Sequence, residues 1–313
     1  MSGGRLAAAY GGEGWSPRLA SLHQEIGTIW SDCGVASEWS PLRAVLLHRP
    51  GDELRDLPDP DEAQMLDRIE TDRAQEQHDA LAAAYRNSGV RVYHVEPADA
   101  PPPNLMFVAD LLFATPEGVI LARPASTVRA GEERHVAARL AALGVPLLRM
   151  VRGRGTFEGA DAAWLDAETV LLATGLRTNS EGAQQVTGLL REMGVEVIQV
   201  GLPYGAMHLM GTLRLADRDL AIAHPGRVPF AAVEALRERG FTVLLAPAYP
   251  EELKKGALNF VTLGPRRVLM PAGCPVSQRF YESVGIHCTT APVDELIKAA
   301  GGIGCLTGVL ARQ

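Results

Sequence analysis

The feature that most constrains the fold of this chain is a hairpin pattern that recurs about every fifty residues. Each copy reads as two short apolar strands joined by a tight turn, and the four copies span residues 110–124, 161–175, 211–225 and 258–273. A fixed period in this range indicates a repeat architecture, in which one small unit is copied and the copies pack against each other.

A helix and a third strand are expected after each hairpin. Apolar residues at helical spacing predict helices over 132–143, 181–193, 229–239 and 277–284, and short apolar runs predict strands over 145–151, 195–200, 241–246 and 285–290. A divergent fifth unit precedes these four. It consists of a strand over 42–50, a long acidic helical stretch over 59–88 and a strand over 90–96.

Five such units favour radial closure, because a closed ring leaves no sheet edge exposed. We therefore predict an α/β fold, a five-bladed αβ propeller with pseudo-fivefold hairpin–helix–strand repeats. An open α/β sheet is the simpler alternative. Residues 1–36 are expected to form an N-terminal tail and lead-in helix, and residues 37–313 a single catalytic domain. Closure would bring the loops beside the hairpins to one central axis.

Composition and charge exclude several classes of function. The net charge of −7 lacks the basic footprint of a nucleic-acid-binding protein. No run of about 18 apolar residues is present, which argues against a membrane span. The four cysteines are widely spaced, which favours a reduced, cytoplasmic setting. We expect a small-molecule partner, no nucleic acid and no membrane, and self-association into a homodimer stays open.

Cys305 is the first candidate for chemistry. It follows Gly301, Gly302 and Gly304 near the end of the chain, and glycines let the backbone approach other groups closely. A thiol placed after such a loop suits a nucleophile, which must be partly ionised to attack. A lone cysteine is also often a small buried apolar residue, and we interpret three others in that way: Cys33, Cys274 and Cys288.

Two polar residues at equivalent places in the repeat supply what such a nucleophile needs. His208 opens the third hairpin at the place that Glu158 takes before the second, and equivalent positions of a radial repeat converge on one axis. Histidine can protonate a leaving amine and then take a proton from water, and Glu158 would orient and charge it. A satisfied polar histidine and a solvated acidic turn are the ordinary alternatives.

Other charged residues suit a cationic substrate that carries a carboxylate. Asp110 stands in an apolar stretch, 105–113, which we expect to be a strand, and its charge there needs a partner. A planar, bidentate guanidinium is a natural partner, although an internal arginine would serve equally well. Asp161 lies beside Glu158, and we expect it to bind substrate as well. Arg129 and Arg177 are candidates for binding a substrate carboxylate, with solvated surface arginines as the alternative.

No cofactor is indicated by the motifs. The chain has no Gly-x-Gly-x-x-Gly after a strand, no phosphate-binding loop and no serine nucleophile elbow. Cysteine and histidine residues are not clustered at the spacing of zinc ligands. We therefore predict chemistry performed by side chains alone, without a metal or an organic cofactor.

With these motifs in this order, the chain resembles the guanidino-group-modifying superfamily of arginine deiminases, dimethylarginine dimethylaminohydrolases and amidinotransferases. The resemblance covers residues 37–312 and rests on segments 37–51, 103–110, 158–161, 177–179, 208–209 and 301–307. It implies the five-bladed propeller, or pentein, fold. It also implies that Cys305 attacks the guanidinium carbon to form a thiouronium intermediate, and that Glu158 fixes His208, the acid and base.

The resemblance further implies which residues hold the substrate. Asp110 would hold the guanidinium, and Asn104, Arg129 and Arg177 the amino-acid end. Met210 stands where arginine deiminases and amidinotransferases usually carry an aspartate. That change makes room for a substituted nitrogen and favours the dimethylarginine branch, whereas Asn104 and the first strand are more similar to arginine deiminases.

We therefore predict a hydrolase that cleaves a C–N bond of an arginine-like guanidino compound and releases a ureido product such as citrulline. A substituted arginine such as dimethylarginine is the first expectation and free arginine the second. Transfer of the amidino group from arginine to an amine is the alternative reaction. A catalytically inactive propeller that only binds other molecules is the alternative of a different class.

Overall fold

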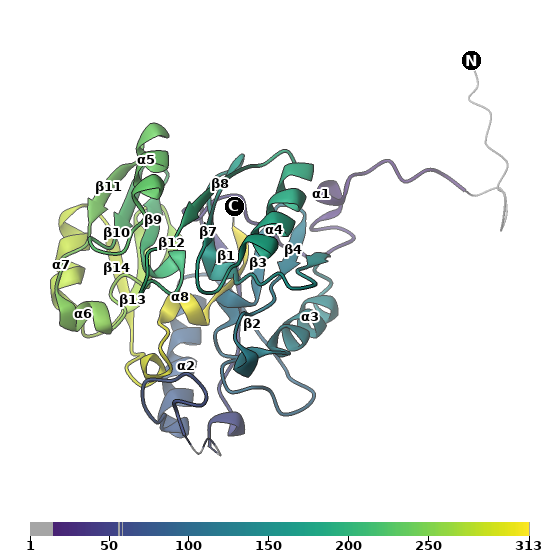
Figure 1. Ribbon diagram of the computed structural model, residues 1–313. Coiled ribbons are helices and arrows are strands. Elements are labelled where there is room, and N and C mark those ends of the chain that lie inside the picture. The colour runs from purple at the N-terminus through teal and green to yellow at the C-terminus, as the bar shows by residue number, and fades with distance from the viewer. Residues whose placement is uncertain (1–14, 56, 58, 313) are drawn as a thin grey trace.

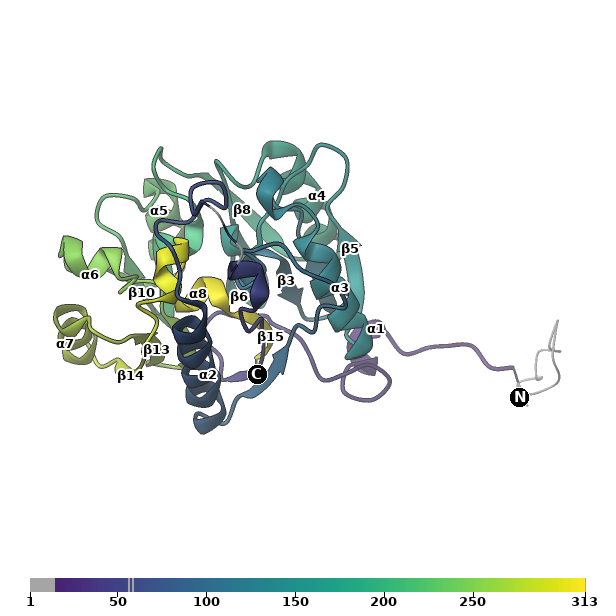
Figure 2. The same cartoon turned by 90° about the horizontal axis from the view of Figure 1, so that it is seen from below.

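The computed structural model describes residues 15–55, 57 and 59–312, and residues 1–14 of the predicted tail lie outside them. The described part of the chain forms five small sheets of three strands each, with helices at their outer sides (Figure 1). The view from below places the sheets around a common centre, with α8 (Ile303–Leu306) near it (Figure 2). This α/β arrangement is the propeller-like repeat of small sheets that the fifty-residue period predicts.

Four of the sheets are each built from one continuous stretch of chain. In each, an antiparallel hairpin leads through a helix into a third strand, which lies parallel to the second. The predicted hairpins, helices and third strands are confirmed. They are β3 (Leu112–Thr115), β4 (Gly118–Leu121), α3 (Glu132–Ala142) and β5 (Leu147–Met150); β6 (Ala162–Asp166), β7 (Thr169–Thr174), α4 (Ser180–Glu192) and β8 (Glu196–Gly201); β9 (Leu213–Asp217), β10 (Leu220–Ala223), α5 (Phe230–Glu238) and β11 (Thr242–Leu245); β12 (Val261–Gly264), β13 (Arg267–Pro271), α7 (Pro275–Ser283) and β14 (His287–Ala291).

The fifth sheet combines the two ends of the described chain. β1 (Leu42–Leu47) lies parallel to β2 (Arg91–His94) and antiparallel to β15 (Gly308–Arg312), a strand that the sequence analysis did not predict. β15 also contacts β3, and β1 contacts β12. Since α8 immediately precedes β15, pairing of the C-terminal strand fixes the position of the segment that carries Cys305.

Two predicted elements are wrong. The helical stretch over 59–88 contains a helix only in its second part, α2 (Thr71–Asn87), because Leu66 donates its N–H to the carbonyl of Lys298 instead of continuing a helix. The strand expected over 105–113 does not form before residue 112, because residues 105–106 lie in a turn and η2 (Val108–Asp110) is a single 3₁₀ turn; β3 begins only after it.

Short elements connect the sheets, and several lie at the ends of hairpins. They are α1 (Leu22–Glu25), η1 (Asp52–Leu54), η3 (Thr127–Arg129), η4 (Gly159–Asp161), η5 (Leu209–Gly211), α6 (Pro250–Lys254) and η6 (Leu296–Ala299). The predicted lead-in helix is only the four residues of α1. No helix in the described part of the chain is long and apolar enough to cross a membrane.

The core lies between the sheets and the helices that cover them. Trp164 is fully buried and stacks on Phe113 from the neighbouring sheet, with ring centroids 5.7 Å apart. Aromatic pairs of this kind stabilise the fold beyond the contribution of the apolar surface that they bury. Because these contacts join neighbouring units, the hairpin ends that carry polar side chains are held by rigid neighbours on both sides.

Candidate active site

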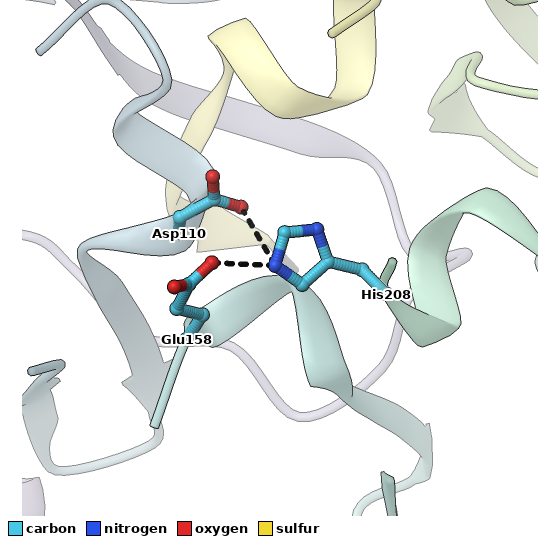
Figure 3. Close-up of side chains that lie close together, drawn as sticks. All are labelled: Asp110, Glu158 and His208. Carbon is cyan, nitrogen blue, oxygen red and sulfur yellow. Dashed lines mark hydrogen bonds and ion pairs between the residues drawn. The ribbon is translucent and has the colours of Figure 1, made fainter. Parts of the chain in front are cut away.

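Three polar side chains from three different units meet at one place. Asp110 ends η2, Glu158 immediately precedes η4, and His208 immediately precedes η5. Figure 3 shows them pointing at one another, and all three are buried. The Nε2 atom of His208 lies 2.6 Å from Oε2 of Glu158 and 3.9 Å from Oδ1 of Asp110. The structure thus brings Glu158 and His208, which the repeat placed at equivalent positions, together with Asp110.

Asp110 has one carboxylate oxygen occupied and one free. Its Oδ2 accepts a hydrogen bond from Arg129 at 2.5 Å. Its Oδ1 is buried and has no hydrogen-bond partner among the residues that the structure describes. Leaving a buried acceptor unsatisfied costs about 1–3 kcal/mol. A free buried oxygen of this kind is suited to a donor that arrives from outside.

Cys305 lies in the short helix α8 and is only half-buried, so its thiol borders a pocket. The glycines before it permit close contacts. A Cβ atom at Gly301 would lie 2.2 Å from the ring of Phe107, and one at Gly302 would lie 3.0 Å from the side chain of Asn259. The glycine-rich approach therefore serves tight packing of the thiol-bearing segment beside its neighbours.

Asn259 holds this segment, and the sequence analysis missed it. Its Nδ2 atom donates to Sγ of Cys305 at 3.2 Å, and its Oδ1 accepts from the backbone N–H of Cys305 at 3.2 Å. The N–H of Gly304 donates to its backbone carbonyl at 3.1 Å. The repeat itself carries the signal that could have found it. From Glu158 to His208 is 208 − 158 = 50 residues, and from His208 to Asn259 is 259 − 208 = 51 residues, so Asn259 opens the last hairpin.

Both carboxylate oxygens of Asp161 accept hydrogen bonds from groups of the chain itself. Its Oδ2 accepts from Thr178 at 2.7 Å, and its Oδ1 accepts from the backbone N–H of Leu209 at 3.0 Å. Burial raises the pKa of Asp161 to about 6, although these hydrogen bonds and the nearby His208 lower it. Asp161, predicted to bind substrate, thus uses both oxygens to fix the turn that follows His208.

Arg129 is buried among carboxylates, which is the internal-arginine alternative considered for Asp110. Besides Asp110 it binds Oε2 of Glu132 through Nε and Nη2, at 3.0 and 2.8 Å, and Nη1 lies 3.7 Å from Glu158. It also donates to the carbonyl of Phe107 at 3.3 Å. Although Arg129 borders the pocket, these contacts favour a role in holding Asp110 over the predicted contact with a substrate carboxylate.

Arg177 and Asn104 border the same small pocket as Cys305. Nη1 of Arg177 is 3.5 Å from Glu158 and has no hydrogen-bond partner among the described residues, so Arg177 keeps donors for an anion. Asn104 is buried and donates to the carbonyl of Ala63 at 2.7 Å, leaving its amide oxygen. Of the two predicted arginines, Arg177 is the one with capacity for a carboxylate.

Met210 lies elsewhere than predicted. Its side chain borders two small cavities of ≈50 and ≈30 Å³ that it shares with Glu38 and Arg214, and Ala109 borders the larger of these. The physical reason is packing, because a Cβ at Gly304 would lie only 3.0 Å from the sulfur of Met210. Met210 therefore packs against the backbone beside Cys305, and it borders neither of the two pockets that Cys305 shares.

Burial and neighbouring charges set the ionisation of the three reactive groups. Burial alone would lower the pKa of His208, but the charge of Asp110 and the hydrogen bond to Glu158 outweigh it and raise that pKa. The pKa of Glu158 is lowered, because His208 and Arg129 outweigh its own burial. Burial raises the pKa of Cys305, and the charge of Asp110 raises it further. His208 is therefore a cation and Glu158 an anion. A bound cation beside Asp110 would offset the charge of that carboxylate and so favour the thiolate form of Cys305.

The same three side chains can be tested as a metal site. Ligand atoms of Asp110, Glu158 and His208 lie within 4.8 Å of one another, and they are the one such group in the described part of the chain. However, Nε2 of His208 and Oε2 of Glu158 are 2.6 Å apart, a hydrogen-bonding distance. Two tetrahedral ligands of zinc would be about 3.3 Å apart, since each lies about 2.0–2.1 Å from the ion. The geometry fits a shared proton beside an organic cation better than a metal.

Comparison with known proteins gives similar results for sequence and for fold. A family model described as "N,N dimethylarginine dimethylhydrolase, eukaryotic" matches residues 61–226. The N(G),N(G)-dimethylarginine dimethylaminohydrolase of Streptomyces coelicolor is 28% identical over 241 residues, which are 77% of this chain and 87% of that protein. The arginine deiminase of Rhodococcus opacus is 54% identical, but over only 61 residues, 19% of this chain and 15% of that one.

The fold is similar to that of a solved enzyme. A structure of the dimethylarginine dimethylaminohydrolase of Pseudomonas aeruginosa, a cysteine-to-serine mutant complexed with citrulline, superposes with a TM-score of 0.72. The match covers 87% of this chain and 100% of that one at 22% sequence identity. At this identity the similarity concerns the fold, and the chemistry of the site has to be argued from its own residues.

Proposed function

Because this chain belongs to the dimethylarginine dimethylaminohydrolase family of guanidino-group-modifying enzymes, we propose that it hydrolyses a C–N bond of an arginine-like guanidino compound. The products are a ureido compound and an amine or ammonia. An Nω-substituted arginine is the first candidate substrate and free arginine the second. We also propose that the five sheets close into a five-bladed propeller, since neighbouring sheets touch through β15 and β3, β1 and β12, and β12 and β9.

One observation carries this proposal: a buried carboxylate oxygen without a partner lies beside a catalytic-type histidine and a half-buried thiol. Oδ1 of Asp110 is free to accept a hydrogen bond, and Cys305 borders the same pocket. A guanidinium donates through several N–H groups in one plane and matches a carboxylate well. It would also supply the positive charge that makes the thiolate of Cys305 favourable.

In the first half of the reaction, the thiolate of Cys305 attacks the guanidino carbon and a C–S bond forms. The tetrahedral adduct collapses when the C–N bond to the leaving amine breaks, and protonated His208 gives its proton to that nitrogen. This step leaves a thiouronium group on Cys305 and a neutral imidazole at His208. The charge of Glu158 stabilises the protonated histidine before the transfer.

In the second half, neutral His208 removes a proton from a water molecule as the oxygen attacks the same carbon. A C–O bond forms, the C–S bond breaks, and the thiolate of Cys305 is regenerated. The second proton of that water is lost to solvent, where the released amine takes it up. The neutral ureido product leaves, and His208 again carries a proton. Asn259 donates to the sulfur throughout, so it can stabilise the negative charge when the thiolate is free.

The test is a colorimetric assay for ureido products without added amine. Arginine, asymmetric dimethylarginine, Nω-hydroxyarginine and agmatine are each incubated with the protein and with its Cys305→Ser variant. A ureido product from any of them, formed by the parent protein and not by the variant, is the expected result. No product from all four would contradict hydrolysis of arginine-like compounds, and adding arginine with an amine then tests amidino transfer through release of ornithine.

A further inference from the structure

Cys305 borders two pockets of very different size. The smaller has a volume of ≈30 Å³ and is bordered by Asn104, Asp110 and Arg177. The larger is a groove of ≈770 Å³ bordered by His208 as well as Cys305. We refer to the larger one as the histidine-side groove. The two reactive side chains therefore face the groove together, while the groups suited to the guanidinium and to an amino-acid end face the small pocket.

The position of His208 determines which part of a substrate the groove can receive. In the proposed reaction His208 protonates the nitrogen that leaves, so the substituent on that nitrogen points to the side of His208. Ammonia or dimethylamine would occupy a small fraction of ≈770 Å³. Pockets of about 300–1,000 Å³ are the size that binds whole drug-sized ligands. The groove is therefore large enough for a leaving amine much larger than dimethylamine.

The charged side chains that border the histidine-side groove are basic, whereas the chain as a whole carries a negative net charge. The protein carries a net charge of −7, yet no aspartate or glutamate is among the described residues that border the groove. Arg227 and Lys254 border it. Arg227 is exposed and forms no ion pair or side-chain hydrogen bond with the described residues, whereas Lys254 lies 3.8 Å from Glu251 at the surface. An anionic group is thus the complementary ligand for Arg227 and Lys254.

The rest of the lining of the histidine-side groove is mostly apolar. Leu66 and Met207 border the groove although 73% and 40% of their surfaces are exposed to solvent. The other apolar side chains that border it are Ala206, Pro225, Ala248, Pro250, Leu253, Leu258, Ile297 and Ala300. Burying such surface against a ligand contributes about 25 cal/mol per Å² of apolar area. An apolar chain between the reacting nitrogen and the anionic end would gain this contribution.

We propose that the histidine-side groove binds the leaving-amine part of the substrate, and that this part is an apolar chain that ends in a carboxylate. The natural substrate class would then be an arginine-like guanidine whose ω-nitrogen carries an acidic alkyl substituent. This inference rests on the proposed function and narrows it. It assigns recognition of the acidic end to Arg227, with Lys254 as a second basic group.

The experiment compares substituents that differ in length and in charge. The assay measures kcat/KM for ureido formation from arginine, Nω-methylarginine, Nω-butylarginine, Nω-(carboxypropyl)arginine and Nω-(carbamoylpropyl)arginine. The last two have nearly the same shape and differ in charge. We expect kcat/KM to be higher for the butyl compound than for the methyl compound. We also expect kcat/KM for the carboxylate to exceed that for the amide by roughly threefold to tenfold, the range of a partly exposed charged contact.

Variants outside the catalytic residues identify the groove as the cause. Arg227→Ala should remove most of the preference for carboxylate over amide, whereas Arg237→Ala, an exposed arginine on α5, should leave it unchanged. Ala248→Trp places a large side chain in the groove. It should lower kcat/KM for the three long substituents at least tenfold and leave arginine and methylarginine unchanged.

The outcomes separate this inference from the proposed function. If arginine or methylarginine is hydrolysed but the long substituents are poorer and Ala248→Trp changes nothing, the groove does not bind the leaving amine. If kcat/KM is equal for the carboxylate and the amide and Arg227→Ala does not change it, the substituent does not end in a carboxylate that Arg227 recognises. If none of the five compounds yields a ureido product, the proposed hydrolysis fails and this inference fails with it.

Discussion

Replacing Asp110 by asparagine should change substrate turnover and thiol reactivity in opposite directions. The Asp110→Asn side chain can still accept the hydrogen bond from Arg129, so the fold around it is kept. What disappears is a negative charge 3.9 Å from Nε2 of His208. At an effective dielectric constant of about 20, such a pair interacts by about 4 kcal/mol. Losing a buried, charged partner of the guanidinium should lower kcat/KM roughly a hundredfold to a thousandfold.

The thiol should respond in the other sense. The charge of Asp110 raises the pKa of Cys305, so its removal favours the thiolate. Asp110→Asn should therefore react faster than the parent protein with iodoacetamide, a neutral reagent, at neutral pH. The same substitution removes a charge that raises the pKa of His208. Both limbs of the profile of kcat/KM against pH should then move to lower pH, because the thiol ionises earlier and the imidazolium loses its proton earlier.

The assay measures alkylation rates of Cys305 and profiles of kcat/KM between about pH 5 and 10, the range in which histidine and cysteine titrate. Asp79→Asn is the matched control, because Asp79 forms an exposed ion pair with Arg49 and should leave both measurements unchanged. If Asp110→Asn lowers turnover while the alkylation rate and both limbs stay where they are, the electrostatic reasoning is refuted. Slower alkylation would also refute it.

Three further predictions concern single side chains. A chloroacetamidine reagent should label only Cys305, as read by peptide mass spectrometry, because the free oxygen of Asp110 can hold the amidinium in the pocket that Cys305 borders. Cys33, Cys274 and Cys288 do not border that pocket, and burial raises the pKa of each to about 11. Labelling of all four would contradict the nucleophile. Asn259→Ala should lower kcat about tenfold to a hundredfold with little change in KM, because it loses a hydrogen bond to the thiolate; an unchanged kcat contradicts that role. Gly159→Ala should not fold, since its Cβ would lie 2.0 Å from the carbonyl oxygen of Leu112. Gly188 of α4 has open space around its Cβ position, so Gly188→Ala should raise the free energy of unfolding by about 0.5–1 kcal/mol, as measured by chemical denaturation.

The site could be located from the sequence because the repeat has a fixed length. Glu158 and His208 stand fifty residues apart at the openings of successive hairpins, and the structure places them 2.6 Å apart. Local patterns were sufficient to predict the hairpins, since each strand pair is joined by a turn within its own unit. A second interval of fifty-one residues leads from His208 to Asn259, so the period points to this residue although its type does not.

What the sequence could not indicate depends on contacts between distant segments. β15 pairs with β1 more than 260 residues earlier, and no local pattern encodes such a partner (308 − 47 = 261). The roles of Arg129 and Asp161 are likewise set by buried neighbours, because their donors and acceptors are already used by Glu132 and Thr178. A charged residue near a site reveals its chemistry only when its remaining hydrogen-bonding capacity is known.

The balance of charge in the site predicts how binding of a cation depends on pH. If all were ionised, four carboxylates would face three cations, and the seven groups are Asp110, Glu132, Glu158, Asp161, Arg129, Arg177 and His208. Burial raises the pKa of Glu132 to about 7 and that of Asp161 to about 6. A proton bound to these carboxylates therefore neutralises part of the excess negative charge. A bound guanidinium supplies that charge instead and releases the proton. Affinity of the Cys305→Ser protein for arginine should therefore rise from about pH 5.5 to 7.5 and then level off. Calorimetric titration in buffers of different ionisation enthalpy measures the released protons, and release of none would show that the cation does not enter this charge network.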